Sequence, residues 1–172
     1  MPLSPSNSSR VAAVSRAASP VTKRMKADKE RVLIDTNILI YATLEDDARF
    51  PRSRDLLLSQ TGDERFVSVQ NLAEMYPNLT GPRMERPDPP SVARAKIQSI
   101  ASLPTIQVLP LTGDVQALAM ELCEKHGITR QRYYDAQLVA IMIAHGVTTL
   151  MTENDADFRE MTEIRAVNPF RS

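Results

Sequence analysis

A short apolar run that ends abruptly in polar residues constrains this chain more than any other feature. The run Val32-Leu33-Ile34 has the length of one buried strand, and Asp35-Thr36-Asn37 follows it before a second apolar run begins. In an open α/β sheet, ligands bind at the carboxyl ends of the strands, so Asp35 is a candidate site residue. Asp35 or Thr36 could instead cap a helix that starts near Ile38. This stretch alone leaves both interpretations open.

Strand-like and helix-like segments alternate along the rest of the chain. The pattern predicts strands at 32–34, 66–69, 106–109, 147–151 and 165–167, and helices at 38–44, 51 to about 62, 71–76, 91–103, 112–126 and 133–144. The proline-rich segment 77–90 is expected to be a loop, and its Arg83 and Arg86 could hold a phosphate backbone. Because no hairpin signals occur, we expect a three-layer α/β/α sandwich around a mainly parallel sheet.

The length of 172 residues fits one domain, which we expect at residues 30–172. Residues 1–29 are rich in serine, proline and basic side chains, and we expect them to form a disordered tail. That segment could also be a targeting peptide, or could lie upstream of a true start at Met25. No apolar stretch reaches the roughly 20 residues of a membrane span, so we expect a soluble, cytoplasmic protein without membrane contact.

Composition excludes several other classes of protein. The net charge is zero, so nucleic acid cannot be held by bulk positive charge and would need local patches or a metal. The single cysteine, Cys123, excludes an intramolecular disulfide, fits a reducing compartment and is expected to fill core space. The chain has neither a phosphate-binding P-loop nor a glycine-rich dinucleotide motif.

Acidic residues stand where predicted strands end and where a buried helix begins. Asp35, Glu74 and the pair Asp155 and Asp157 follow strands, and Asp135 opens the apolar helix 133–144. Each also has a structural interpretation, since Glu74 fits a capping-box-like helix start and Asp135 could cap its helix. Two carboxylates about 4 Å apart repel by roughly 4 kcal/mol at an effective dielectric near 20, so a cluster needs a cation.

Oxygen ligands of this kind suit Mg²⁺, with Mn²⁺ as an alternative. Such an ion can activate water and stabilise a leaving oxygen on phosphorus, so phosphodiester hydrolysis is the chemistry that fits best.

Five motifs carry a resemblance to a known family. They are Val32-Leu33-Ile34-Asp35-Thr36-Asn37, Glu74 after the second strand, Tyr134-Asp135-Ala136, Thr152-x-Asn154-x-x-Asp157-Phe158, and Val167-Asn168-Pro169-Phe170. Together, from about Arg31 to Phe170, they resemble the PIN domain, in particular the ribonuclease toxins of VapBC toxin–antitoxin pairs. The resemblance implies a Mg²⁺-dependent endoribonuclease that is selective for RNA sequence or structure. It also implies a homodimer that a cognate antitoxin inhibits by covering the acidic pocket.

The resemblance also implies roles for single residues. Asp35, Glu74 and Asp135 correspond to metal ligands, and Asn37 or Thr36 would orient the first of them. Many relatives carry an acidic residue two places after the threonine, where this chain has Asn154. Asp157 matches the family's aspartate before phenylalanine, and Asp155 could substitute for it. The expected catalytic set is Asp35, Glu74, Asp135 and Asp157, and the expected metal set adds Asn154.

Two other functions start from the same residues. A phosphatase of the haloacid dehalogenase type also begins with an aspartate after its first strand, but typically has a second aspartate where this chain has Asn37. A degenerate PIN-like module would bind RNA without cleaving it, which the nearly complete acidic set disfavours.

Overall fold

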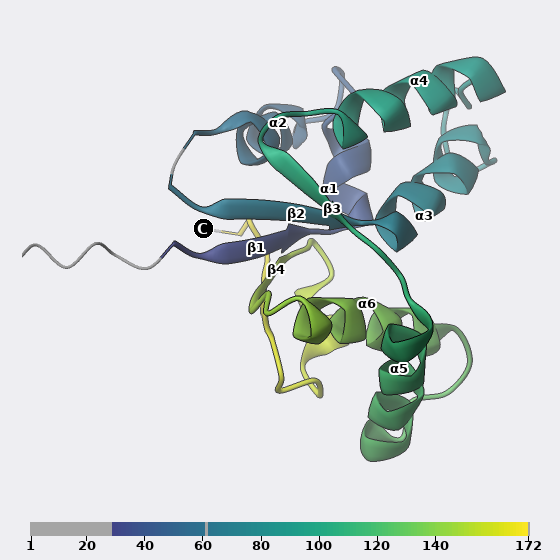
Figure 1. The fold of residues 1–172 in the computed structure, drawn as a ribbon. Helices are drawn as coiled ribbons and strands as arrows, with labels where there is room; N and C mark the ends of the chain where they lie inside the picture. The colour runs from purple at the N-terminus through teal and green to yellow at the C-terminus, as the bar shows by residue number, and fades with distance from the viewer. Residues whose placement is uncertain (1–28, 61, 172) are drawn as a thin grey trace, which may run out of the picture.

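The computed structural model describes residues 29–60 and 62–171 (Figure 1). The tail expected at 1–29 lies, apart from Lys29, outside the described residues, so its disorder and the domain boundary stay predictions. Five strands form one sheet: β1 (Arg31–Ile34), β2 (Glu64–Ser68), β3 (Ile106–Leu109), β4 (Thr149–Met151) and β5 (Arg165–Val167). Their order is β3-β2-β1-β4-β5, and every neighbouring pair is parallel.

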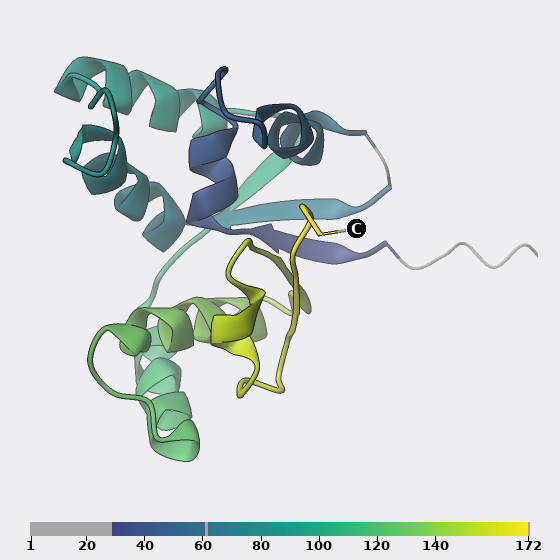
Figure 2. The ribbon, with the colours of Figure 1, turned by 180° about the vertical axis from the view of Figure 1, so that it is seen from behind.

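Helices cover both faces of the sheet, as Figures 1 and 2 show. One layer contains α1 (Thr36–Tyr41), α2 (Phe50–Leu58), α3 (Val69–Thr80) and α4 (Pro90–Ala101), and the other contains α5 (Gly113–His126) and α6 (Tyr133–Ala144). Two short 3-10 turns, η1 (Arg130–Arg132) and η2 (Asp155–Phe158), precede α6 and follow β4. The predicted α/β/α sandwich is therefore confirmed. Of the described helices, none is long and apolar enough to cross a membrane.

Apolar side chains on the two faces of β1 build two separate cores. Leu33 packs toward α5 and α6, while Ile34 packs toward α1–α4. Strands buried on both faces in this way explain why the sequence shows continuous apolar runs rather than alternation. Strands β2 and β4 lie on opposite sides of β1 in the sheet. In an open α/β sheet, ligands bind in the crevice beside the carboxyl end of a strand where the strand order changes direction in this way.

Several boundaries differ from the sequence prediction. Helix α1 starts at Thr36 rather than Ile38, and α2 ends at Leu58 rather than near residue 62. Helix α3 was expected at 71–76 but spans Val69–Thr80, because Ser68 rather than Asn71 is its N-cap and because the helix continues through Pro77. The expectation that the loop begins at Pro77 was wrong, since the helix persists for three further residues.

Candidate active site

The predicted acidic residues meet in one cavity of about 220 Å³ at the carboxyl ends of the strands. All five residues of the expected metal set line it: Asp35, Glu74, Asp135, Asn154 and Asp157. Asp155 does not line it, because it points to Arg171 instead, with 2.9 Å between Oδ1 and Nη1. The turn η2 therefore brings Asn154 and Asp157 to the cavity and turns Asp155 away. The structure places Asp155 outside the site for which it was an alternative.

Asp35 is both the N-cap of α1 and a wall of the cavity. Its Oδ1 accepts a hydrogen bond from the backbone N–H of Thr36 at 2.7 Å. Its Oδ2 accepts from Thr152 Oγ1 at 2.7 Å and from Asn37 Nδ2 at 2.9 Å. Burial raises the pKa of Asp35 to about 6; the Thr152 and Thr36 hydrogen bonds oppose this shift, and the charge of Glu74 adds to it. The two interpretations of Asp35 are therefore compatible.

Glu74 is oriented through both of its oxygens. Thr36 Oγ1 donates to Oε2 at 2.9 Å, and Gln70 Nε2 donates to Oε1 at 2.9 Å. Gln70 Nε2 also donates to the carbonyl of Tyr134 at 2.9 Å, which joins α3 to the first turn of α6. Sequence reasoning missed Gln70. Gln70 stands four residues before Glu74, a spacing that brings two side chains together on a helix. The spacing gave no prediction here, because the helix was expected to begin one residue after Gln70.

Asp135 does not cap its helix. It is the third residue of α6, and within the described chain its carboxylate accepts no hydrogen bond. Burial raises its pKa to about 6, and the nearby charge of Asp157 adds to the shift, whereas Arg132 opposes it. A half-buried carboxylate with acidic neighbours and no donor is unfavourable as it stands. The capping interpretation of Asp135 is therefore wrong, because the residue lies inside the first turn.

The chemistry of these donors fits a divalent cation. Four carboxylates and one amide converge on a single cavity, and mutual repulsion contributes to the raised pKa values of Asp35 and Asp135. A cation would relieve that repulsion, and oxygen donors are those that Mg²⁺ prefers. As the side chains stand, no three acidic, histidine or cysteine residues of the described chain form a metal-binding group.

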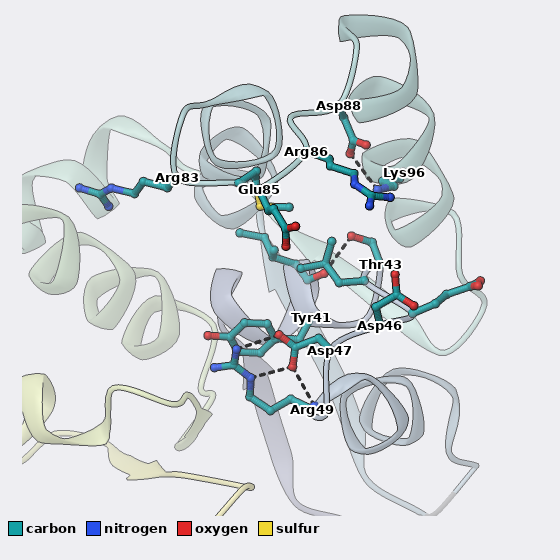
Figure 3. A pocket seen from close by; sticks show the side chains of 14 residues that line it. Tyr41, Thr43, Asp46, Asp47, Arg49, Arg83, Glu85, Arg86, Asp88 and Lys96 are labelled. Atoms are coloured by element: carbon teal, nitrogen blue, oxygen red, sulfur yellow. Dashed lines mark hydrogen bonds and ion pairs between the residues drawn. The ribbon is translucent and has the colours of Figure 1, made fainter.

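A larger cavity of about 590 Å³ lies between the segment after α1 and the α3–α4 loop (Figure 3). Many of its charges are already paired. Arg49 bonds to Asp47 and to Glu153 at 2.7–2.9 Å and covers the ring of Tyr41 at 3.6 Å, and Lys96 bonds to Asp88 at 2.8 Å. None of the five predicted metal-site residues lines this cavity. It is thus distinct from the acidic cavity, although Ile40 lines both.

The basic loop segment does not border the acidic cavity. Arg83 and Arg86 are exposed and line the larger cavity, and Figure 3 shows Arg83 pointing away from the other labelled side chains. Glu153, which Arg49 holds, stands between Thr152 and Asn154 in the chain. The Arg49 ion pairs thereby anchor the segment that carries one wall of the acidic cavity.

Comparison with known proteins places the fold. A family model described as "PIN domain" matches residues 32–164. VapC20 of Mycobacterium tuberculosis, a Sarcin-Ricin loop cleaving toxin, superposes with a TM-score of 0.60 at 22% identity, covering 78% of this chain and 98% of its own. VapBC2 of Rickettsia felis, solved bound to a promoter DNA fragment, gives 0.57 at 18% identity, with 80% and 98% covered.

FitAcB of Neisseria gonorrhoeae gives a TM-score of 0.58 at 19% identity, with 82% of this chain and 99% of its own covered. No curated protein sequence matches this chain. At these identities the likeness to the solved structures concerns the fold.

Proposed function

The chain belongs to the PIN domain family, and from that premise we propose that it is a Mg²⁺-dependent endoribonuclease, the toxin of a VapBC-type toxin–antitoxin pair. One observation carries the proposal: Asp35, Glu74, Asp135 and Asp157 come from four separate segments of the chain and line one cavity. The fold likeness to VapC20 and to VapBC structures supports it. We further propose that it acts in the cytoplasm, as a homodimer that a cognate antitoxin inhibits.

In this proposal the four carboxylates hold Mg²⁺, or Mn²⁺ in its place, and Asn154 contributes a neutral oxygen. The bound ion would supply the positive charge that activates water and stabilises the leaving oxygen. Thr36, Thr152 and Gln70 keep Asp35 and Glu74 oriented through the hydrogen bonds described above. Such outer contacts fix the direction of a ligand's lone pairs, which a rigid site requires.

The position of Asn37 weighs against a phosphatase. Its amide donates to Asp35 Oδ2 at 2.9 Å and its own Oδ1 accepts from the backbone N–H of Glu153 at 3.3 Å. Asn37 stands where a haloacid dehalogenase typically has its second aspartate, and here it supports Asp35 through a hydrogen bond. Binding of RNA without cleavage is the remaining alternative, and Mn²⁺ titration separates it, because a scaffold has no need of the ion.

The test is cleavage of single-stranded and structured RNA by purified protein with Mg²⁺. We expect Asp35→Asn to lower the rate by at least about 100-fold, since the site loses a charged ligand. Asp155→Asn is the matched control: it removes a nearby carboxylate that lies outside the cavity, and we expect little change. Equal cleavage by wild type and Asp35→Asn, or none by wild type across a broad RNA panel, contradicts the proposal.

A further inference from the structure

Tyr134 is an aromatic side chain exposed at the rim of the acidic cavity. It lines the cavity together with Asp35, Glu74 and its neighbour Asp135, yet 55% of its surface is exposed. Tyrosine is not needed there for the hydrophobic core, since Ala136 and the following residues of α6 are the ones that are buried. An exposed ring beside a set of candidate catalytic carboxylates has surface available for a ligand.

The ring is held by a rigid support. Gln70 binds the carbonyl of Tyr134 at 2.9 Å, and the ring packs edge to face against Tyr133, with 5.6 Å between centroids. The hydroxyl of Tyr133 in turn accepts a hydrogen bond from Gln137 at 3.2 Å. Because the backbone and the neighbouring ring are fixed, a ligand that stacks on Tyr134 would lose little additional side-chain entropy in the protein.

An unpaired cation stands in the turn before the same helix. Arg130 is exposed, and its side chain has neither a hydrogen bond nor an ion pair within the described residues. Its backbone is left-handed, with φ of 57°, and among the described residues other than glycine it alone has a positive φ. Strained backbone of this kind costs free energy and is often found at functional sites. Arg130 therefore offers a charge to a phosphate that approaches Tyr134.

We propose that Tyr134 is the stacking platform for an unpaired nucleobase of the RNA, with Arg130 contacting a phosphate of the same strand. The proposal rests on the proposed ribonuclease function. With zero net charge, the chain cannot gain RNA affinity from bulk electrostatics, so local contacts, charged or uncharged, have to supply it. Stacking on an aromatic ring is such a contact and requires a base free of its duplex. The substrate class is then RNA that is unpaired next to the cleaved bond.

Affinity for single-stranded RNA, measured by fluorescence anisotropy with Mg²⁺ in the Asp35→Asn background to prevent cleavage, tests the proposal. We expect Tyr134→Ala to raise Kd by about 5- to 150-fold, as stacking is worth roughly 1–3 kcal/mol per base. Tyr134→Phe should retain the affinity. Tyr76→Ala is the matched control, because Tyr76 is a 43% exposed tyrosine on α3 that lies outside the acidic cavity.

A second measurement reports stacking directly. The chain has no tryptophan, so Tyr134→Trp introduces a single tryptophan whose fluorescence a stacked base should quench, whereas the tryptophan of Tyr76→Trp should stay bright. The proposal is overturned if Tyr134→Ala leaves Kd unchanged, or if the tryptophan fluorescence of Tyr134→Trp is not quenched at saturating RNA. The exposed ring would then be a contact for a protein partner instead. If the Asp35→Asn parent and the wild type both bind no RNA, the proposed function fails as well.

Discussion

A single carboxylate can be both a helix cap and a site residue. Asp35 could be predicted as a cap or as a site residue, and the structure shows that it caps α1 through Oδ1 while Oδ2 faces Thr152 and Asn37. A sequence pattern shows that an aspartate is present, but it does not show which partner each of the two carboxylate oxygens contacts. For Asp135 the capping interpretation was wrong, because α6 starts at Tyr133, three residues before the position where a helix capped by Asp135 would begin.

The hydrogen bonds of Gln70 lead to a prediction at the residue scale. Gln70→Met keeps the side-chain length but removes the donor to Glu74 Oε1, so Glu74 loses one of its two orienting contacts. We expect the Kd for Mn²⁺ to rise by about 10- to 100-fold, the usual effect of losing an outer contact to a metal ligand. Isothermal titration calorimetry without RNA measures it.

Gln137→Met is the matched control for this substitution. Gln137 is 6% exposed and Gln70 is 8% exposed, and among the described residues the Gln137 side chain donates only to the hydroxyl of Tyr133. Its replacement should therefore leave Mn²⁺ affinity unchanged. Parallel losses in both variants would show that the effect comes from α6 packing rather than from Glu74.

At the scale of elements, the first residue of a helix was harder to predict than the presence of the helix. Asn71 was expected to be the N-cap of α3, but the capping box uses Ser68 as the cap and Asn71 as the third helical residue. Both residues are favourable caps, and the local sequence does not decide between them. The shift brings Gln70 into the first turn, which is why its contact with Glu74 was missed.

The end of α3 gives a prediction at this scale. A Cβ on Gly81 would lie 2.4 Å from the backbone oxygen of Pro77, because the chain turns back over the last turn of the helix. We expect Gly81→Ala to lower the free energy of unfolding by about 1–3 kcal/mol, measured by urea denaturation. Gly113→Ala, where a Cβ meets nothing within 4 Å, should be neutral or slightly stabilising.

At the scale of the whole molecule, the parallel sheet explains why the acidic set could be predicted. Strands running in one direction bring their carboxyl ends to one edge, so Asp35 and Glu74, 39 positions apart in the chain, reach one cavity. The exposure of Tyr134 and the larger cavity beside Arg49 could not be predicted, because both depend on the directions in which side chains leave their helices.

The acidic cavity should make stability depend on pH and on Mg²⁺. The folded-state pKa values of Asp35 and Asp135 are raised to about 6, so without metal these groups favour the folded state less as pH rises from about 4 to about 6. Mg²⁺ binds the deprotonated carboxylates, so it should raise Tm by roughly 5–10 °C near pH 7.5 at saturating concentration and much less near pH 5.

Asp135→Asn is the informative variant for that experiment. Its side chain is half-buried and accepts no hydrogen bond within the described chain, so the change removes a charge without breaking a hydrogen bond there. In EDTA we expect the variant to be more stable than wild type above pH 6, by about 1 kcal/mol, and to differ little near pH 4. An equal Mg²⁺ shift of Tm at both pH values would contradict a cavity that exchanges protons for the ion.

The direction of β1 has a practical consequence for measuring binding. The described chain enters the sheet at Arg31, at the end of β1 opposite to Asp35, and Figures 1 and 2 show that entry point at the far side from the starts of α1 and α3. An affinity tag or surface anchor attached ahead of β1 would leave the acidic cavity turned toward the solution. Immobilised protein should then give the same RNA affinity as free protein.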